Sequence, residues 1–328
     1  MNDTAAPVPD NLTHRFGSWL AWSLAFAAIG YIGFSLYVGI DDVAAALVHF
    51  DWIWMVVALA LTVFGNYFLR FLKWHWLIWR LGVRLPFWES ALIFVAGLAM
   101  VISPAKAGEV LKPYLVRERT GVAMATTIPA LVTERLTDGI AALIIAAVSV
   151  SKFASDQAGY VYGTIAVTLL GVAVLMNERA SLAILRQLSK VGFIHRFADK
   201  LEELYRSLRV CLAPWPFFVT LVVSIIAWFA ECWGYQLLWL GFGREVPLED
   251  ASFLYAFATV AGGISPGGLG IADGLLVTLP EQVLKLPRPE VLAASMLIRG
   301  ATLWIGVLLG AIALLFVGPL LRRPKLAP

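Results

Sequence analysis

The sequence predicts an all-α integral membrane protein with about six full transmembrane helices and two re-entrant helical hairpins related as an inverted repeat. Three observations support this fold class. The 328 residues are 60% hydrophobic and 14% charged, with a mean hydropathy of +0.81, whereas soluble domains are about 45–50% apolar and about 25% charged. Long charge-free runs recur along the chain, and a pattern around a Ser-Pro turn occurs twice. The apolar excess excludes a soluble enzyme, a disordered chain and a disulfide scaffold.

Long apolar runs place the transmembrane helices, since about 20 apolar residues are needed to cross a bilayer. The runs that are long enough are Ser18–Ile40, Trp52–Leu69, Thr120–Ser151, Gln157–Asn177, Val210–Gly243 and Gly300–Leu321. Most carry no charge, but Val210–Gly243 contains Glu231 and Thr120–Ser151 has three charged residues in its middle. Two other apolar segments, Ala91–Ala105 and Ala251–Ala272, run into Pro/Gly-rich turns, which favours re-entrant hairpins.

Loop charges indicate the orientation, because Lys and Arg concentrate on the cytoplasmic side. Asp41–Asp51 holds three aspartates and no basic residue, so we place this loop outside. Basic residues follow the second span, the first hairpin and the last span, which places these regions and both termini inside. Arg70 and Lys73 are interpreted as side chains that snorkel to the headgroups. We therefore expect a multi-pass protein of a bacterial-type cytoplasmic (inner) membrane.

In this interpretation, residues 1–328 form a single polytopic membrane domain. It contains a first repeat at residues 52–153 and a second repeat at residues 211–321. Between them, leucines recur at helical spacing in residues 178–210, which predicts a cytoplasmic amphipathic segment.

The internal repeat indicates how the two halves are related. Ile102-Ser-Pro-Ala-Lys-Ala-Gly-Glu in the first half returns as Ile264-Ser-Pro-Gly-Gly-Leu-Gly in the second, with Asp273 close behind. About thirty residues after each Ser-Pro turn, an arginine lies inside an apolar helix, first Arg135 and then Arg299. The predicted topology has the first turn facing the cytoplasm and the second facing outside. Such inverted repeats with broken helices are typical of transporters whose site lies near the membrane midplane.

Charged residues inside apolar helices mark the candidate site, because an arginine at a helix centre costs about 2.5–3.5 kcal/mol. Arg135 has Glu134 beside it and Asp138 three residues later. A structural ion pair and a ligand site both remain open for this group.

Arg299 has no carboxylate nearby in sequence, so its partner is Asp273, Glu231 or a ligand. We favour an anion, because guanidinium binds phosphate through two parallel hydrogen bonds and unwound turns expose N–H groups that attract anions. The candidate substrate-binding residues are Arg135, Arg299, Lys112, Ser103, Pro104, Ser265, Gly267 and Gly268. The candidates for orienting these residues or relaying protons are Glu109, Glu134, Asp138, Asp273 and Glu231.

The paired turns and charges resemble the flippase-like family named after the transmembrane region of lysylphosphatidylglycerol synthase. That family includes the membrane half of the bacterial multiple peptide resistance factor. Its first motif, Pro-Gly-x-x-Gly-Glu with a basic residue and Glu-Arg-x-x-Asp, resembles Pro104-Ala105, Gly108-Glu109, Lys112 and Glu134-Arg135-x-x-Asp138. Its second motif, Pro-Gly-Gly-Leu-Gly-x-x-Glu with a later arginine, resembles Pro266 to Gly270, Asp273 and Arg299. The resemblance covers essentially the whole chain, with Ala105 in place of the usual glycine and Asp273 in place of the usual glutamate.

The resemblance implies a lipid flippase or scramblase that moves an anionic lipid, either a phospholipid or a polyprenyl-phosphate-linked lipid, between leaflets. Arg135 and Arg299 would hold the phosphate. The soluble aminoacyl-transfer domain of the resistance factor has no counterpart here, so we expect no enzymatic activity. The expected partners are the anionic membrane lipid, the bilayer and a second copy of the chain. We expect no cofactor and no metal, since the four histidines lack ligand spacing, and no nucleic acid, since the net charge is only +3.

Two alternatives stay open. An ion-coupled transporter of a small soluble anion would use the same inverted-repeat cavity. A membrane-embedded lipid-linked glycosyltransferase is suggested by Asp41 and Asp42, because such enzymes often place acidic pairs in the first outer loop. Against this second alternative, the sequence shows no second acidic metal cluster.

Overall fold

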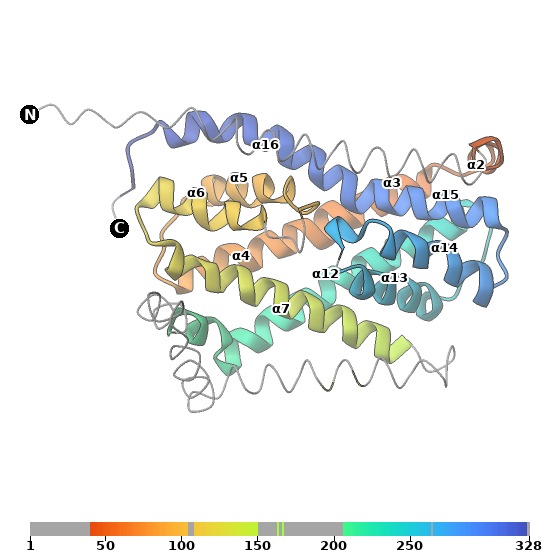
Figure 1. Cartoon of the computed structure of the whole chain (residues 1–328), viewed down its shortest axis with the longest axis horizontal. Coiled ribbons are helices and arrows are strands. Elements are labelled where there is room, and N and C mark those ends of the chain that lie inside the picture. The colour runs from red at the N-terminus through yellow and green to blue at the C-terminus, as the bar shows by residue number, and fades with distance from the viewer. Residues whose placement is uncertain are drawn as a thin grey trace, which may run out of the picture.

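The computed structural model describes residues 40–103, 108–149, 206–263 and 265–326, together with residues 163 and 166. These residues confirm an all-helical membrane protein (Figure 1). Three continuous helices, Ile53–Arg80, Pro214–Gly241 and Arg288–Leu321, are long and apolar enough to cross a membrane. A fourth long helix, α7 (Met124–Ser149), contains the charged residues noted above.

Two of the spanning helices contain a turn of wider π-helix. The first consists of α3 (Ile53–Ala60), η1 (Leu61–Tyr67) and α4 (Phe68–Arg80). The last consists of α15 (Arg288–Arg299), η5 (Gly300–Trp304) and α16 (Ile305–Leu321). The Tyr67 hydroxyl at the end of η1 donates a hydrogen bond to the Thr302 carbonyl in η5. The two π-helical segments are therefore tied to each other.

The broken segments form two helical hairpins. One pairs α5 (Phe87–Leu98) with α6 (Leu111–Thr120), and the other pairs α13 (Leu248–Gly262) with α14 (Ile271–Val283), with the short 3-10 turn η4 (Pro266–Gly268) between them. The hairpins lie at opposite ends of the molecule and their turns approach its centre (Figure 1).

The hairpin turns contact each other. A Cβ built on Gly267 would lie only 3.3 Å from the Cα of Ile102, and Ile102 packs with Leu303 and Val307 in a small buried cluster. The prediction that one turn faces the cytoplasm and the other faces outside stays a prediction, because the contact between the turns does not define the two sides of the membrane. The bases of the hairpins lie at opposite ends, and the turns meet because each short helix reaches only part of the way through the bundle.

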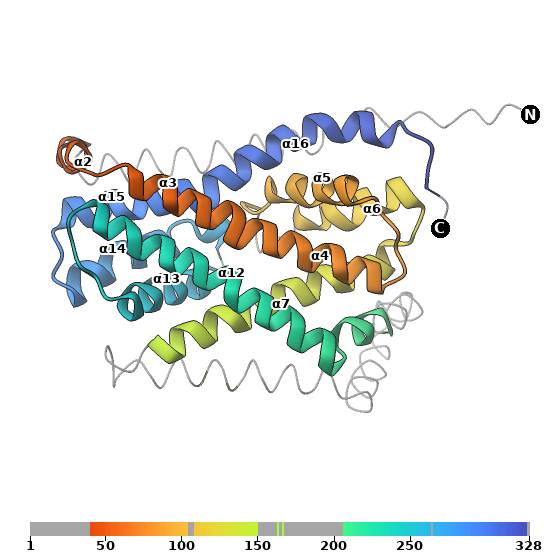
Figure 2. The same ribbon diagram turned by 180° about the vertical axis from the view of Figure 1, so that it is seen from behind.

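Each hairpin packs against the long helix that carries the repeated arginine, Arg135 or Arg299, of the other half. Helix α5 lies along α16, where Gly310 comes so close that its Cβ would lie 2.2 Å from the backbone nitrogen of Ala99. Helix α13 lies along α7 in the same way. The spanning helix Ile53–Arg80 runs antiparallel to α12 (Pro214–Gly241), with Gly65 against Ala230 (Figure 2).

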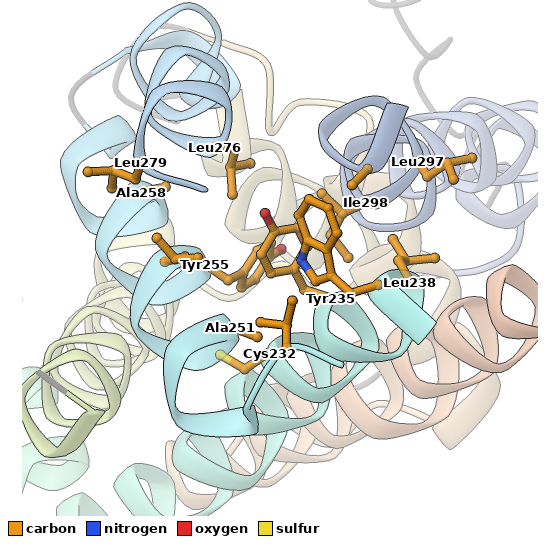
Figure 3. Packing of buried hydrophobic residues seen from close by; sticks show 14 of the residues in the cluster. Cys232, Tyr235, Leu238, Ala251, Tyr255, Ala258, Leu276, Leu279, Leu297 and Ile298 are labelled. Atoms are coloured by element: carbon orange, nitrogen blue, oxygen red, sulfur yellow. The ribbon is translucent and has the colours of Figure 1, made fainter. Parts of the chain in front are cut away.

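Aromatic and aliphatic side chains fill the core of the second half. Tyr235 of α12 and Tyr255 of α13 lie between helices with ring centroids 5.8 Å apart. Leu276 and Leu279 of α14 and Ile298 of α15 close this core from the other side (Figure 3). Burial of this large apolar surface anchors both helices of the second hairpin to the long helices.

Several predicted elements differ from the structure or lie outside its description. The predicted outer loop Asp41–Asp51 contains a helix, α2 (Ile40–Val48), because its Val-Ala-Ala-Ala-Leu run favours helix. The predicted spans Ser18–Ile40 and Gln157–Asn177 lie almost wholly outside the described residues. Of the predicted amphipathic segment at residues 178–210, only residues 206–210 are described, and they are helical.

Candidate functional site

A network of ion pairs is buried where α4, α6 and α7 meet. Glu134 of α7 is at its centre and is fully buried. Its Oε1 lies 3.2 Å from Nη2 of Arg70 and 2.6 Å from Nη2 of Arg135, and its Oε2 lies 2.6 Å from Nζ of Lys112. One carboxylate thus joins cations from three helices.

Asp138, one helical turn further along α7, is a second centre of the network. Its Oδ1 lies 2.5 Å from Nζ of Lys73, and its Oδ2 lies 3.2 Å from Nε of Arg70 and 3.8 Å from Nη1 of Arg135. The Ser224 hydroxyl of α12 donates a hydrogen bond to Asp138 Oδ1 over 2.9 Å and accepts one from Lys73 over 2.6 Å. These contacts connect α4, α7 and α12 inside the bundle.

The interpretation of Arg70 and Lys73 as snorkelling side chains is wrong. Both are buried, 6% and 3% exposed, because the helix continues to Arg80 and carries them into the bundle, where carboxylates of α7 receive them. A signal for this was present: Asn66, Arg70 and Lys73 recur at helical spacing on one face of an apolar helix. Asn66 accepts a hydrogen bond from Arg70 over 3.3 Å.

The side chain of Lys112 in α6 is buried among the residues that the structure describes. Its stem crosses Gly97 of α5, where a Cβ would lie 2.5 Å from the Lys112 Cγ. Its ammonium lies 4.8 Å from the ring centroid of Trp74 and 5.0 Å from that of Phe94, within range of cation–π attraction. Lys112, one of the basic residues that follow the first hairpin, is therefore a buried residue of α6 and not a cytoplasmic loop residue.

Glu109, just before α6, completes the network. Its Oε2 lies 3.0 Å from Nη2 of Arg135 and 3.7 Å from Nζ of Lys112, yet neither of its carboxylate oxygens has an aligned hydrogen bond in the described structure. The network holds four cations (Arg70, Lys73, Lys112 and Arg135) and three carboxylates (Glu109, Glu134 and Asp138). Its formal charge is therefore positive, which favours an anion nearby.

A smaller charged group lies at the second turn. Nε of Arg299 lies 2.8 Å from Oδ1 of Asp273, and Nη2 of Arg299 donates a hydrogen bond to the Gly267 carbonyl. Gly267 and Gly268 have φ of 59° and 79°, a region that favours glycine and leaves the turn carbonyl pointing at the arginine. Of the two carboxylates that the sequence offered as partners, Asp273 is the one that pairs with Arg299.

Glu231 of α12 lies near both groups and receives a hydrogen bond of 2.8 Å from the Tyr255 hydroxyl. Ser103 and Ser265, two of the predicted substrate-binding residues, make hydrogen bonds within their own turns. Ser103 accepts a hydrogen bond from the Gly108 amide and donates to the Met100 carbonyl, and Ser265 donates to the Gly262 carbonyl. Both hydroxyls stabilise their own turns, so they hold the hairpin ends in shape.

A cavity lies between the two charged groups, where the hairpin turns meet. It holds about 690 Å³ of space free of protein atoms, including the part open to solvent. Arg70, Arg135 and Arg299 all line it, together with the acidic Glu231. Aromatic side chains and glycines complete the wall, among them Tyr67, Trp228, Tyr255, Gly262, Gly263, Gly267, Gly268 and Gly306.

The structure brings most of the predicted residues to this region but not all of them to the cavity. Arg135, Arg299, Gly267, Gly268 and Glu231 line it. The predicted residues behind this wall are Lys112, Glu109, Glu134, Asp138 and Asp273, which contact the arginines or one another. Pro104 lies outside the described residues, as do the side chains of Asp41 and Asp42.

The fold and the arginines that line the cavity identify the class of protein as a polytopic membrane protein with a charged internal cavity. The sequence matches the family described as the lysylphosphatidylglycerol synthase TM region over residues 20–310. Because this match covers most of the chain, the protein belongs to that family, as the resemblance at the turns predicts. No curated protein sequence matches the chain.

Proposed function

We propose that this protein is a flippase or scramblase that moves an anionic, phosphate-bearing lipid between the leaflets of the membrane. One observation carries the proposal: Arg70, Arg135 and Arg299 come from three different helices and converge on a single cavity inside the bundle. A phospholipid headgroup and a polyprenyl phosphate share the phosphate group that such a cluster recognises. The bilayer is the source of this ligand.

The chemistry of the cavity supports an anionic group. Guanidinium presents a rigid fork that matches two phosphate oxygens, and it keeps its charge in a site of low polarity. Three guanidinium groups line the cavity, together with one carboxylate, that of Glu231. Placing them inside the membrane is costly, which marks them as functional when several share one cavity.

The arrangement of the hairpins supports a route between the leaflets. In the proposal, the hairpins are re-entrant and the two halves form an inverted repeat. The reciprocal packing of α5 on α16 and of α13 on α7 fits this relation. Rocking of one half against the other would open the cavity first to one leaflet and then to the other. In the proposed orientation, both termini are cytoplasmic and the membrane is a bacterial-type inner membrane.

The test is lipid exchange in proteoliposomes that contain fluorescent phosphatidylglycerol, with the outer leaflet bleached by dithionite. We expect exchange with the wild type and loss of exchange with Arg135→Ala/Arg299→Ala. Arg288→Gln is the control, because Arg288 is half-exposed, lies 3.9 Å from Glu281, and its replacement removes one positive charge away from the cavity. Exchange that persists in the double variant would contradict the site.

Arg135 also belongs to the buried network, so the double variant can lose exchange simply because it does not fold. A second variant that leaves Arg135 and the network intact is therefore needed. Arg299→Lys keeps the charge and loses the fork, and we expect it to slow exchange while it elutes as a folded protein in size exclusion. An exchange rate equal to that of the wild type would also argue against phosphate recognition by Arg299.

A soluble anion is the alternative ligand, because its phosphate chemistry is the same. Uptake of radiolabelled inorganic phosphate into the same proteoliposomes separates the two. Uptake without lipid exchange would replace the flippase proposal with that of an anion transporter. Neither reaction forms or breaks a covalent bond, so the proposed protein is not an enzyme.

A further inference from the structure

The contact between Asp273 and Arg299 is close but poorly aligned. Oδ1 of Asp273 lies 2.8 Å from Nε of Arg299, yet both atoms are buried and neither has an aligned hydrogen bond in the part of the chain that the structure describes. A charge-assisted hydrogen bond at this distance normally points its N–H at the acceptor. This ion pair therefore stabilises both partners by charge but lacks the directional part of the interaction.

The guanidinium of Arg299 is held in place by other contacts. Nη2 donates to the Gly267 carbonyl, and the group lies over Gly268, where a Cβ would be 3.4 Å from Nη1 and 3.5 Å from Nη2. Arg299 therefore keeps its position at the cavity wall through the turn. Its carboxylate partner can exchange without the arginine leaving the site.

The corresponding arginine of the first half is paired differently. Arg135 has an aligned hydrogen bond of 2.6 Å to Glu134 and lies within 3.0 Å of Glu109 and 3.8 Å of Asp138. Among the described residues, Asp273 is the one carboxylate within ion-pair distance of Arg299. The second half of the cavity thus depends on a single, misaligned anion.

We propose that Asp273 is a resident anion that occupies Arg299 in the empty protein and that an incoming phosphate group displaces it. Asp273 then sets the affinity of the cavity by competing with the ligand. This inference rests on the proposed function, because it needs a phosphate to enter the cavity. It assigns to Asp273 a role opposite to that of a ligand-binding residue.

The position of Asp273 also connects displacement to the hairpin. Its second oxygen, Oδ2, accepts a hydrogen bond of 3.0 Å from the Gly270 amide at the start of α14. The same carboxylate is therefore bound to the hairpin by one oxygen and to α15 by the other. When the phosphate takes Arg299, the ion pair between α14 and α15 opens while the cap of α14 remains. Helix α14 then loses its ion pair with α15, while the turn of the second hairpin stays bound to Arg299 through the Gly267 carbonyl.

The test compares charge-free variants of Asp273 in the purified full chain. Native mass spectrometry measures binding of phosphatidylglycerol in one arm, and equilibrium dialysis measures binding of inorganic phosphate in the other. Asp273→Asn removes the competing charge and keeps an oxygen for the Gly270 amide, so we expect binding at least tenfold tighter than in the wild type. Asp273→Ser is a second charge-free variant and should shift the affinity in the same direction.

Two controls isolate the effect. Glu281→Gln makes the same change in net charge on the same helix, at a side chain that is 36% exposed and paired with Arg288, and should leave the affinity unchanged. The double variant Asp273→Asn/Arg299→Gln should not bind the phosphate group more tightly than the wild type, because the gain in affinity requires the arginine with which Asp273 pairs. A gain that survives without Arg299 would overturn the proposal.

The outcomes separate this inference from the proposed function. Unchanged or weaker binding in both Asp273 variants, with wild-type binding that depends on Arg299, would overturn the competition and leave the proposed function standing. Absence of binding in the wild type in both arms would overturn both. Tightening in the phosphate arm alone would support the displacement and identify a free anion, not a lipid headgroup, as the ligand.

Discussion

Replacement of Glu134 by glutamine tests whether the buried network holds the bundle together. Glu134→Gln keeps the shape of the side chain and removes the charge that meets Lys112 at 2.6 Å, Arg135 at 2.6 Å and Arg70 at 3.2 Å. The network then has two carboxylates for four cations. Because Glu134 is fully buried, water cannot replace the lost charge.

The remaining contacts set the magnitude of the loss. Breaking a buried ion pair by removing one partner costs about 3–5 kcal/mol. Asp138 still lies 3.2 Å from Nε of Arg70 and Glu109 still lies 3.0 Å from Nη2 of Arg135, so part of the charge stays compensated. We therefore expect a loss near the lower end, about 3 kcal/mol in the free energy of unfolding. At about 2–4 °C per kcal/mol, the melting temperature should fall by about 6–12 °C.

The assay is thermal unfolding followed by tryptophan fluorescence in one detergent. Glu281→Gln is the control, because its half-exposed pair with Arg288 is worth at most about 1 kcal/mol. If Glu134→Gln melts together with this control, the reasoning is refuted and the carboxylate contributes no net stability. A large fall confined to Glu134→Gln would show that the network stabilises the packing of α4 and α6 on α7.

Two further predictions concern packing outside the cavity. Gly310→Ala should lower the melting temperature clearly, since its Cβ would lie 2.2 Å from the Ala99 nitrogen and overpacking costs about 1–3 kcal/mol. Gly318→Ala on the same helix meets no atom within 4 Å and should leave the melting temperature unchanged. Equal melting temperatures of the two variants would argue against close packing of α5 on α16. Arg119→Gln should speed tryptic cleavage near the C-terminus, since the Arg119 side chain donates a hydrogen bond to the Pro324 carbonyl. The Leu326 amide keeps its hydrogen bond to the backbone carbonyl of residue 119 in this variant, so an unchanged cleavage rate would show that this bond and the apolar contacts hold the segment.

The class of protein and its main features follow from local patterns in the sequence. Apolar runs predict spanning helices, and the Pro/Gly punctuation predicts the breaks that separate α5 from α6 and α13 from α14. The repeated Ser-Pro pattern also points to Arg135 and Arg299, which both line the cavity. These features depend on the type and spacing of residues along the chain, so the sequence displays them directly.

The sequence does not show which charged residues form ion pairs with each other. Lys73 and Asp138 are 65 residues apart, and Arg70 and Glu134 are 64 apart, so no helical spacing relates them. The positive-inside rule places Arg70 and Lys73 at the headgroups, because the rule uses only the charge of a residue and not its neighbours in the fold. In the bundle, buried carboxylates of α7 compensate these cations, and the interior becomes the more favourable place.

The amino-acid sequence by itself determined that this chain lies in a membrane, that it belongs to its family and that its Ser-Pro turns and the arginines that follow them come in pairs. Only the tertiary structure decided that the two turns meet, that Arg70 joins Arg135 and Arg299 at one cavity, and that Asp273 rather than Glu231 pairs with Arg299. The physical reason is that helix formation and membrane insertion depend on neighbouring residues. The neutralisation of a buried charge depends on which helices pack together.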